Sequence, residues 1–273
     1  MYPIRRGITI LSWYGFGVDL AGKRVLITGA SSGIGAALAR ELKVQGARLV
    51  LAARRVHELT KLADELGSAA EVQPADLATA AGADALAQAV GPVDVLVNNA
   101  GIDLVGKPWK DGLADRGDRL FQVNVLSALR LTNRLLRPMV DKRDGAVVFM
   151  SSVSAWLPFP GSAWYAASKA ALHQFAQTIR IDCKGTGVRV LGVYPGPIHT
   201  PMLDKALETE AGKKFFGRLP IGKVEPLAAR IVDALVRDEE TVVYPRVYQA
   251  THWLGGLSRR LVTMTTPAVK PRS

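Results

Sequence analysis

The stretch Arg24-Val-Leu-Ile-Thr-Gly-Ala-Ser-Ser-Gly-Ile-Gly35 decides the fold, because a short apolar run passes through a glycine-rich turn into a helix-forming run at residues 36–46. A second apolar run, residues 48–52, follows at once. Short β-branched runs favour strands, and apolar residues repeated every three or four positions favour helices. The stretch therefore predicts a strand, a tight turn, a helix and a second strand parallel to the first.

The same alternation of apolar runs and helical patterns continues along the chain. Further strands are expected at residues 93–97, 146–150, 188–193 and 241–244. Continuous apolar runs are typical of parallel strands, since these are buried on both faces of a sheet. We expect an α/β fold, with helices on both faces of one doubly wound parallel sheet.

No repeat, low-complexity segment or Pro/Gly-rich linker divides the chain. Its 273 residues and 48% hydrophobic content suffice for one large core. We expect a single domain at residues 21–245. An N-terminal extension, residues 1–20, precedes it, and a basic amphipathic C-terminal extension, residues 246–273, follows it.

The net charge of +11 is concentrated toward the C-terminus. Residues 246–273 hold several basic residues and no acidic one, namely Arg246, Arg259, Arg260, Lys270 and Arg272. Aromatic and basic residues do not interleave as they do on base-reading surfaces. Nucleic-acid binding is therefore not expected.

Cysteine and histidine usage indicates neither a disulfide nor a metal. Cys183 is the single cysteine, and the four histidines lie at no metal-ligand spacing. No apolar run reaches the ~18 residues that span a bilayer. We expect a cytoplasmic protein without a metal, and the two termini leave open a peripheral contact with a membrane surface.

The glycine turn offers a cradle for a phosphate. Glycines let the backbone approach a pyrophosphate, and the start of the following helix presents unpaired N–H groups. The spacing Gly29-x3-Gly33-x-Gly35 departs from the common dinucleotide fingerprint, in which two glycines one residue apart precede a third. A plain tight turn is the alternative interpretation.

The stretch Tyr165-Ala-Ala-Ser-Lys169 puts a phenol and an ammonium on one face of a helix. A free tyrosine keeps its proton to about pH 10, and a neighbouring positive charge lowers that pKa. The pair is therefore a candidate proton donor. A solvated helix face is the alternative.

Five motifs, taken together and in this order, resemble those of the short-chain dehydrogenase/reductase family. They are Thr28-Gly29-x3-Gly33-x-Gly35, Asn98-Asn-Ala-Gly101, Ser152, Tyr165-x3-Lys169 and Pro195-Gly196. The resemblance covers roughly residues 21–245. It implies a Rossmann-like fold, a nicotinamide cofactor, and hydride transfer to or from a carbonyl or an alcohol.

The resemblance also implies roles for four catalytic residues. Tyr165 would exchange a proton with the substrate oxygen, and Ser152 would donate a hydrogen bond to that oxygen. Lys169 would lower the pKa of the phenol and bind the nicotinamide ribose. Asn124 would hold a water that connects the lysine to solvent, with a locally satisfied helix residue as its alternative.

Cofactor contacts are implied after several strands. The residues expected to bind the cofactor are Gly29, Ser31, Ser32, Gly33, Ile34, Gly35, Arg54, Asp76, Leu77, Asn98, Ala100, Gly101, Tyr165, Lys169, Pro195, Gly196, Ile198 and Thr200. Asp76 is equally suited to cap a helix. The segment after Pro195 could also be a stiff turn.

The end of the second strand indicates which dinucleotide is preferred. Ala53 stands where an acidic residue would bind the adenosine ribose of NAD, and Arg54 and Arg55 follow it. A guanidinium pairs with a 2′-phosphate, whereas an aspartate would repel it. We expect NADP(H) to be preferred over NAD(H), with Arg54 as the main contact and Arg55 as a second candidate.

Apolar residues surround the expected reaction centre. They are Trp156, Leu157, Phe159, Trp164, Met202, Leu203, Leu207, Phe215, Phe216 and Leu219. They suit a hydrophobic carbonyl or alcohol substrate, or they simply pack a lid. The direction of the reaction and the substrate itself stay open.

The C-terminal residues Val247, Ala250, Leu254, Leu257, Leu261 and Met264 form a stripe at helical spacing. The stripe could pack on the domain or a sister subunit, touch a membrane, or end in disorder. The family resemblance implies a homodimer or a homotetramer. A non-catalytic NADP-binding sensor or scaffold of the same fold is the alternative function.

Overall fold

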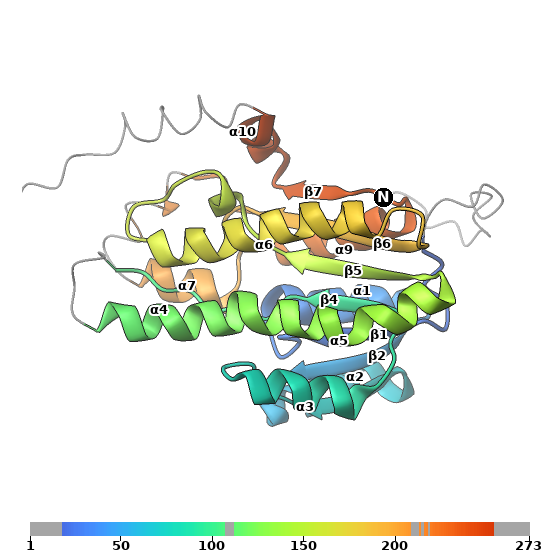
Figure 1. Cartoon of the computed structure of the whole chain (residues 1–273). Helices are drawn as coiled ribbons and strands as arrows, with labels where there is room; N and C mark the ends of the chain where they lie inside the picture. The colour runs from blue at the N-terminus through green and yellow to red at the C-terminus, as the bar shows by residue number, and fades with distance from the viewer. Residues whose placement is uncertain (1–17, 107–111, 209–212, 214–215, 218, 254–273) are drawn as a thin grey trace, which may run out of the picture.

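In the computed structural model, seven parallel strands form one sheet in the order β3-β2-β1-β4-β5-β6-β7. The structure describes residues 18–106, 112–208, 213, 216–217 and 219–253. The strands are β1 Arg24–Thr28, β2 Arg48–Ala53, β3 Ala70–Pro74, β4 Val95–Asn98, β5 Gly145–Met150, β6 Val188–Pro195 and β7 Thr241–Tyr244. The predicted doubly wound parallel sheet is thus confirmed (Figure 1).

Helices cover both faces of the sheet because the strand side chains alternate between two cores. One core joins Val25 and Ile27 to α1 Gly33–Val44, α2 Val56–Leu66 and α9 Val224–Val236. The other joins Leu26 to α3 Ala80–Val90, α5 Ser127–Lys142 and α6 Ala163–Asp182. The remaining α-helices of the described residues are α4 Leu113–Phe121, α7 Pro201–Leu207 and α10 Gln249–Trp253.

Short irregular helices occur at four places in the described residues. Three are 3-10 turns, η2 Gly67–Ala69, η4 Val153–Ala155 and η5 Arg246–Tyr248. The fourth, η3 Gln122–Leu126, is a π-helical turn between α4 and α5. Such turns inside a helix are frequent at functional sites.

The expected elements differ from the observed ones mainly at their ends. The first helix begins at Gly33, three residues before the predicted start at residue 36, because the glycine turn itself supplies its first turn. Strand β4 begins at Val95, two residues after the predicted start at residue 93. The carboxylate of Asp94 accepts a 2.8 Å hydrogen bond from the backbone N–H of Arg24, outside the regular ladder.

The strand order reverses between β1 and β4, which creates a crevice beyond their carboxyl ends. Strands β2 and β3 lie to one side of β1, and β5, β6 and β7 lie beyond β4. Ligands of open α/β sheets bind at such a reversal. The predicted motifs at Gly29, Asn98, Ser152 and Pro195 all begin at or just after the carboxyl ends of strands, at this edge of the sheet.

The described ends of the domain pack onto it. Val18 and Leu20 fall in the predicted N-terminal extension, yet both are buried, and the Val18 N–H donates to Leu235 O at 3.1 Å. Within the described ranges, no helix has the length and hydropathy needed to cross a membrane. The stripe residues from Leu254 onward lie outside the described residues.

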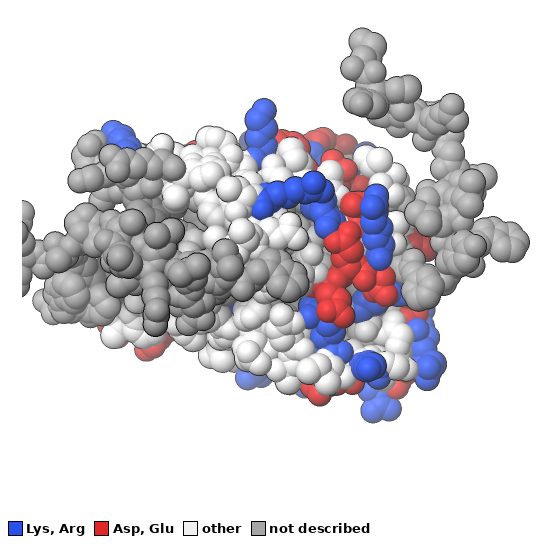
Figure 2. Space-filling model, turned by 90° about the horizontal axis from the view of Figure 1, so that it is seen from above, with Lys and Arg blue, Asp and Glu red and all other residues white. Residues whose placement is uncertain are grey.

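Basic and acidic side chains interleave on the face seen in Figure 2. Arg189 lies between Asp144 and Asp238, at 3.7 Å and 3.4 Å from their carboxylate oxygens. Such exposed pairs contribute about 0–1 kcal/mol each to stability. The positive charge of Arg189 is thus flanked by two acidic groups.

Candidate active site

The glycine turn after β1 is packed too closely for any side chain at two positions. Gly29 has a φ of +67°, and a Cβ there would lie 2.8 Å from the Cα of Ala100. A Cβ on Gly35 would lie 2.5 Å from the carbonyl oxygen of Gly29. The turn therefore brings its backbone against the loop after β4, and α1 begins at this contact.

Thr28 and Asn99 tie these two loops together. The Thr28 hydroxyl accepts 3.0 Å hydrogen bonds from the backbone N–H groups of Asn99 and Ala100, and donates to Val97 O at 3.1 Å. The Asn99 amide donates to Thr28 O at 2.8 Å and to Gly29 O at 3.2 Å. The cradle is therefore held rigidly before any ligand binds.

The start of α1 keeps donors available at this cradle. Ser32 occupies the N-cap position of α1, but its side chain makes no capping hydrogen bond. Backbone N–H groups in the first turn of a helix have no partner within the helix. The helix N-terminus therefore faces the crevice as a site for an anion such as a phosphate.

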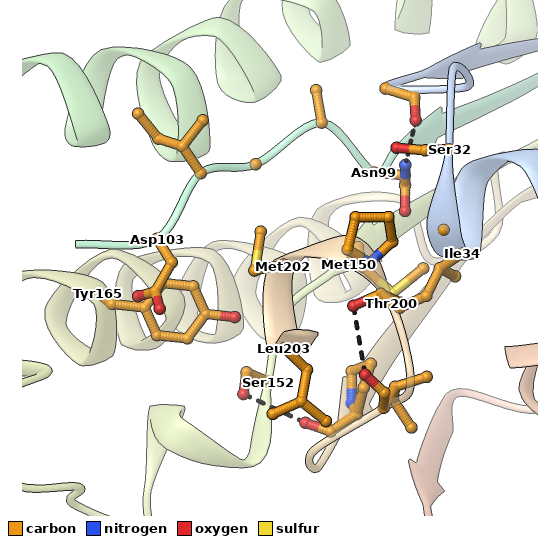
Figure 3. Close-up of a pocket in the computed structure, with 18 of the residues that line it drawn as sticks. Ser32, Ile34, Asn99, Asp103, Met150, Ser152, Tyr165, Thr200, Met202 and Leu203 are labelled. Carbon is orange, nitrogen blue, oxygen red and sulfur yellow. Dashed lines mark hydrogen bonds between the residues drawn. The ribbon is translucent and has the colours of Figure 1, made fainter. Parts of the chain in front are cut away.

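One cavity of about 380 Å³ joins the glycine turn to the tyrosine. Figure 3 shows Ser32, Ile34 and Asn99 at one end and Asp103 and Tyr165 at the other. The predicted site residues that line it are Gly29, Ser31, Ser32, Gly33, Ile34, Arg54, Asp76, Leu77, Ala100, Gly101, Ser152, Tyr165, Lys169, Pro195, Gly196, Ile198 and Thr200. The volume lies in the range of small-molecule sites.

Three predicted site residues do not line the cavity. Gly35 is buried beneath the turn, and Asn124 is buried behind the loop after β4. The side chain of Asn98 is buried and donates to the Thr132 hydroxyl at 3.0 Å, which ties β4 to α5. Its Oδ1 is buried without a partner in the described part of the chain.

Arg55 makes the closest side-chain contacts to the glycine turn. Its guanidinium donates to the Ser31 hydroxyl at 3.0 Å and to the Ser32 hydroxyl at 2.6 Å. Arg54 also lines the cavity, next to Ala53. The two guanidiniums thus stand at the end of β2, where the acidic residue of an NAD site would lie.

Asp76 does not cap the helix that follows it. Its carboxylate accepts a 3.0 Å hydrogen bond from the Ala78 N–H, and Thr79 caps α3 by accepting from Gly82 N at 3.0 Å. The carboxylate lies at the cavity edge, on the far side of β2 from the tyrosine. The helix-cap alternative for Asp76 is therefore wrong.

Ser152, Tyr165 and Lys169 meet at the other end of the cavity. Ser152 ends the segment after β5 and donates to Pro195 O at 3.1 Å. The Nζ of Lys169 donates to Met150 O at 2.8 Å and lies 5.5 Å from the centre of the Tyr165 ring. The serine, the phenol and the ammonium therefore share one end of the cavity.

The charges of this triad differ from the simple expectation. Burial, and then the charge of Asp103, raise the pKa of Tyr165 above its ordinary value, against the hydrogen bond from Ser152. Burial also lowers the pKa of Lys169 to about 8. In the cofactor-free protein the pKa of the phenol is therefore raised overall, opposite to the direction expected from Lys169 alone.

Asn124 lies in the π-helical turn and binds the loop that follows β4. Its Oδ1 accepts from Ile102 N at 2.8 Å, and its Nδ2 donates to Ile102 O at 3.0 Å and to the Ser168 hydroxyl at 3.1 Å. A Cβ on Gly101 would lie 3.4 Å from Asn124 Oδ1 and 3.5 Å from Lys169 Nζ. Asn124 therefore clamps the backbone directly beside the lysine.

The apolar residues divide between the cavity and its surroundings. Phe159, Met202, Leu203 and Phe216 line the cavity. Trp156 instead packs 4.8 Å from Tyr194, measured between ring centres, and donates to the Thr251 hydroxyl at 3.0 Å. Trp164, also outside the cavity, packs edge-on against Phe121 at 5.9 Å, and Phe215 lies outside the described residues.

Sequence reasoning missed several residues that line this cavity, among them Asn99 and Asp103. Asn99 belongs to the motif Asn98-Asn-Ala-Gly101, so the motif itself could have indicated that Asn99 lines the site. Asp103 follows that motif in an ordinary loop, and nothing in the sequence pointed it toward Tyr165. In the described ranges, no group of three or more His, Cys, Asp or Glu residues is arranged to hold a metal ion.

Comparisons with known proteins agree with this arrangement. Residues 23–211 match the family model for short chain dehydrogenases. The uncharacterized oxidoreductase YvaG of Bacillus subtilis is 36% identical over 235 residues, which cover 82% of this chain and 87% of that protein. 11-beta-hydroxysteroid dehydrogenase A of Sesamum indicum is 34% identical over 254 residues, which cover 87% and 72%.

A solved structure is similar as well. The short-chain dehydrogenase from Sphingobium yanoikuyae in complex with NADPH is 28% identical with a TM-score of 0.75, covering 92% of this chain and 98% of that one. The present chain belongs to the short-chain dehydrogenase/reductase family. It is a nicotinamide-dependent oxidoreductase that acts on CH–OH groups.

The cavity fits the dinucleotide that this family uses. The glycine turn lines the cavity at Ser31, Ser32 and Gly33, and its close packing at Gly29 fixes the position of that backbone. The free N-terminus of α1 suits a pyrophosphate. The polar groups of Tyr165 and Lys169 at the opposite end suit a ribose and a reacting carbonyl.

Proposed function

We propose that the protein is an NADP(H)-dependent oxidoreductase that interconverts a hydrophobic carbonyl and its alcohol, with Tyr165 as the acid and base. The observation that carries the proposal is the meeting of Ser152, Tyr165 and Lys169 at the end of the cavity opposite the glycine turn. A screen of ketones and alcohols by chain length and ring size, followed by NADPH absorbance, tests it.

Each side chain has a distinct task in the proposed reaction. When bound, the nicotinamide supplies or accepts the hydride. The Tyr165 hydroxyl gives its proton to the substrate oxygen in reduction and takes it back in oxidation. The Ser152 hydroxyl donates to the same oxygen and stabilises the charge that develops there. Lys169 binds the ribose and places a positive charge beside the phenol.

Asn124 acts in this proposal as a positioning residue. Its amide fixes the backbone at Ile102 and so places Gly101 against the lysine ammonium. The family role of a water holder stays a prediction for this residue. Gly29, Gly33 and the first turn of α1 would hold the pyrophosphate, and Asp76 with Leu77 would meet the adenine.

The preference for NADP(H) is proposed from the end of β2. Similar solved chains carry NADPH in two cases and NAD or NADH in two others, so the fold alone does not set the preference. Ala53 leaves room and no negative charge, and Arg54 and Arg55 bring two guanidiniums to the cavity edge. A 2′-phosphate would accept hydrogen bonds from such groups.

Replacing Arg54 or Arg55 with alanine should weaken NADPH binding by about tenfold or more while changing the NADH affinity little, because charge-assisted hydrogen bonds contribute about 1.5–3 kcal/mol. Fluorescence titration with both dinucleotides measures this. Arg116→Ala on α4, an exposed arginine away from the cavity, is the matched control. An unchanged NADPH/NADH ratio in both variants would rule out the arginine site.

The apolar substrate class is proposed from the cavity walls. The cavity walls include four large apolar side chains, those of Phe159, Met202, Leu203 and Phe216. A relative named as a hydroxysteroid dehydrogenase supports a bulky apolar substrate. The preferred members of the screen should therefore be those that bury a ring or an alkyl chain.

A homodimer or homotetramer and a peripheral membrane contact are further proposals. Tyr248 is buried and Trp253 is the last described residue, so a chain ending at Trp253 retains every residue that the structure describes. Light scattering of this chain and of the full chain would reveal whether residues 254–273 govern assembly. Equal sedimentation of both with anionic liposomes would count against a membrane role for that segment.

A further inference from the structure

Asp103 places a carboxylate at the reaction end of the cavity. It lies in the loop after β4 and lines the cavity together with Ser152, Tyr165 and Lys169. Figure 3 shows it at the same end as Tyr165, away from Ser32 and Asn99. It is not one of the four residues to which the family resemblance gives a catalytic role, so its presence there needs a separate explanation.

The loop that carries Asp103 is fixed on both sides. Ile102 is bound at both backbone polar groups by Asn124, at 2.8 Å and 3.0 Å. Leu104 is buried in a small core with Leu113 and Leu120, against which Tyr165 packs. Further along, the Gly106 N–H donates to Gly161 O at 2.9 Å. The carboxylate is therefore held in place relative to the tyrosine.

One of the two oxygens of this carboxylate accepts a hydrogen bond from the described residues. Its Oδ1 accepts from the Leu104 N–H at 2.7 Å. For Oδ2, the described residues provide no hydrogen bond and no ion pair. Burial raises the pKa of Asp103, and the Leu104 N–H and the charge of Lys169 oppose that effect. A carboxylate in such surroundings gains from one more donor.

Apart from Lys169, the other charged residues of the cavity lie at the opposite end. Arg54, Arg55 and Asp76 follow β2 and β3, which lie across β1 from the strands that lead to Ser152 and Tyr165. Among the described lining residues, Asp103 is therefore the one acid at the reaction end. A hydrogen-bond donor on a substrate bound at this end would meet Oδ2.

We infer that Asp103 is a specificity-determining residue, and that the preferred substrates carry a hydroxyl or ammonium group close to the reacting carbonyl, on an otherwise apolar body. The inference rests on the proposed function and names its substrate class more closely. The carboxylate accepts a hydrogen bond from that group and so orients the carbonyl toward Ser152 and Tyr165.

A matched set of four phenyl ketones tests the inference. Their methyl carbon carries hydrogen, hydroxyl, methoxy or ammonium. A carboxylate accepts hydrogen bonds and donates none, so it distinguishes the hydroxyl from the methoxy group. In the wild type, kcat/KM with NADPH should be about tenfold or more higher for the hydroxy and ammonium ketones than for the methoxy ketone.

Asp103→Asn is the informative variant because its amide oxygen can still accept from the Leu104 N–H. Its NH₂ group would donate equally to a hydroxyl and a methoxy oxygen, so the hydroxy/methoxy ratio should fall by about 10- to 100-fold. Asp64→Asn on the exposed side of α2 is the control, and its ratio should match the wild type. Unfolding temperatures verify that both variants fold.

An unchanged hydroxy/methoxy ratio in Asp103→Asn, or a wild type that prefers neither ketone, would overturn the inference. If no ketone oxidises NADPH, the proposed function fails separately. The role of Asp103 is then decided by calorimetric binding of the same ketones to the NADPH-saturated protein. Tighter binding of the hydroxy ketone that disappears in Asp103→Asn supports the inference, and equal or absent binding of the two overturns it.

Discussion

Replacing Tyr165 with phenylalanine should reduce kcat by about 100- to 10,000-fold, the usual contribution of a positioned acid or base. Dinucleotide binding should change by less than about threefold, because the ring stays packed against the core at Leu104 and Leu120 and loses one hydroxyl alone. Steady-state kinetics of ketone reduction, with a fluorescence titration of NADPH, separates the two effects.

Tyr244→Phe on β7 is the matched control, because Tyr244 is another partly buried tyrosine and does not line the cavity. Its kinetics should equal those of the wild type. If Tyr165→Phe kept more than about a tenth of the wild-type rate, another group would have to supply the proton, and the assignment of Tyr165 would fail.

Replacing Lys169 with methionine should damage both functions of the site and yet stabilise the cofactor-free protein. We expect kcat to fall about 100-fold or more and NADPH binding to weaken about tenfold, because Lys169 would serve the phenol and the ribose together. The two losses distinguish this variant from Tyr165→Phe. The same kinetic and fluorescence measurements apply.

The stability gain follows from the buried ammonium. The Lys169 side chain is 3% exposed, and its pKa is lowered from 10.5 to about 8. Between these values the unfolded chain holds a proton that the folded chain has released, so the wild type gains stability as the pH rises through this window. Below about pH 8 the folded state carries the charge at a cost of up to about 3 kcal/mol.

Methionine removes that cost, and the loss of the hydrogen bond to Met150 O offsets part of the gain. Without cofactor, the unfolding temperature of Lys169→Met should therefore exceed that of the wild type near pH 7, and the difference should shrink toward pH 10. Lys184→Met, at an exposed lysine, is the control. A Lys169→Met protein that unfolds at a lower temperature than the wild type near pH 7 would contradict the account. An unfolding temperature raised by the same amount at pH 7 and at pH 10 would contradict it as well.

Local patterns were enough to predict the sheet and one wall of the cavity. The apolar runs predicted six of the seven strands, because parallel strands need apolar side chains on both faces, as Val25, Leu26 and Ile27 illustrate. Strand β3 has no such run, since it is an edge strand that carries Glu71 and Gln73. The glycine turn was equally readable, since a Cβ at Gly29 or Gly35 would collide with neighbouring backbone. In the strands and the glycine turn, the residue types needed are set by the local backbone and its immediate neighbours, so the sequence alone reveals them.

The parts that could not be predicted depend on packing between distant segments. Trp156 reads as a cavity wall from its place near Tyr165, but η4 turns it toward Tyr194 and Thr251. The pKa of Tyr165 was expected to fall because of Lys169, whereas burial and Asp103 raise it. Neither the burial nor the position of Asp103 follows from spacing, because the loop geometry is set by Asn124 from another helix.

The most direct test of the account is whether deuterium passes from labelled NADPH to the alcohol product. Wild-type protein is given NADPH that carries deuterium at the transferred position of C4, together with the best ketone of the screen, and the alcohol is analysed by mass spectrometry and NMR. We predict that the wild type and Tyr244→Phe form alcohol with deuterium on the former carbonyl carbon. Tyr165→Phe should form almost none of this labelled alcohol in the same time. An absence of labelled alcohol from the wild type across the whole screen would contradict the account and favour a non-catalytic NADP-binding protein of the same fold.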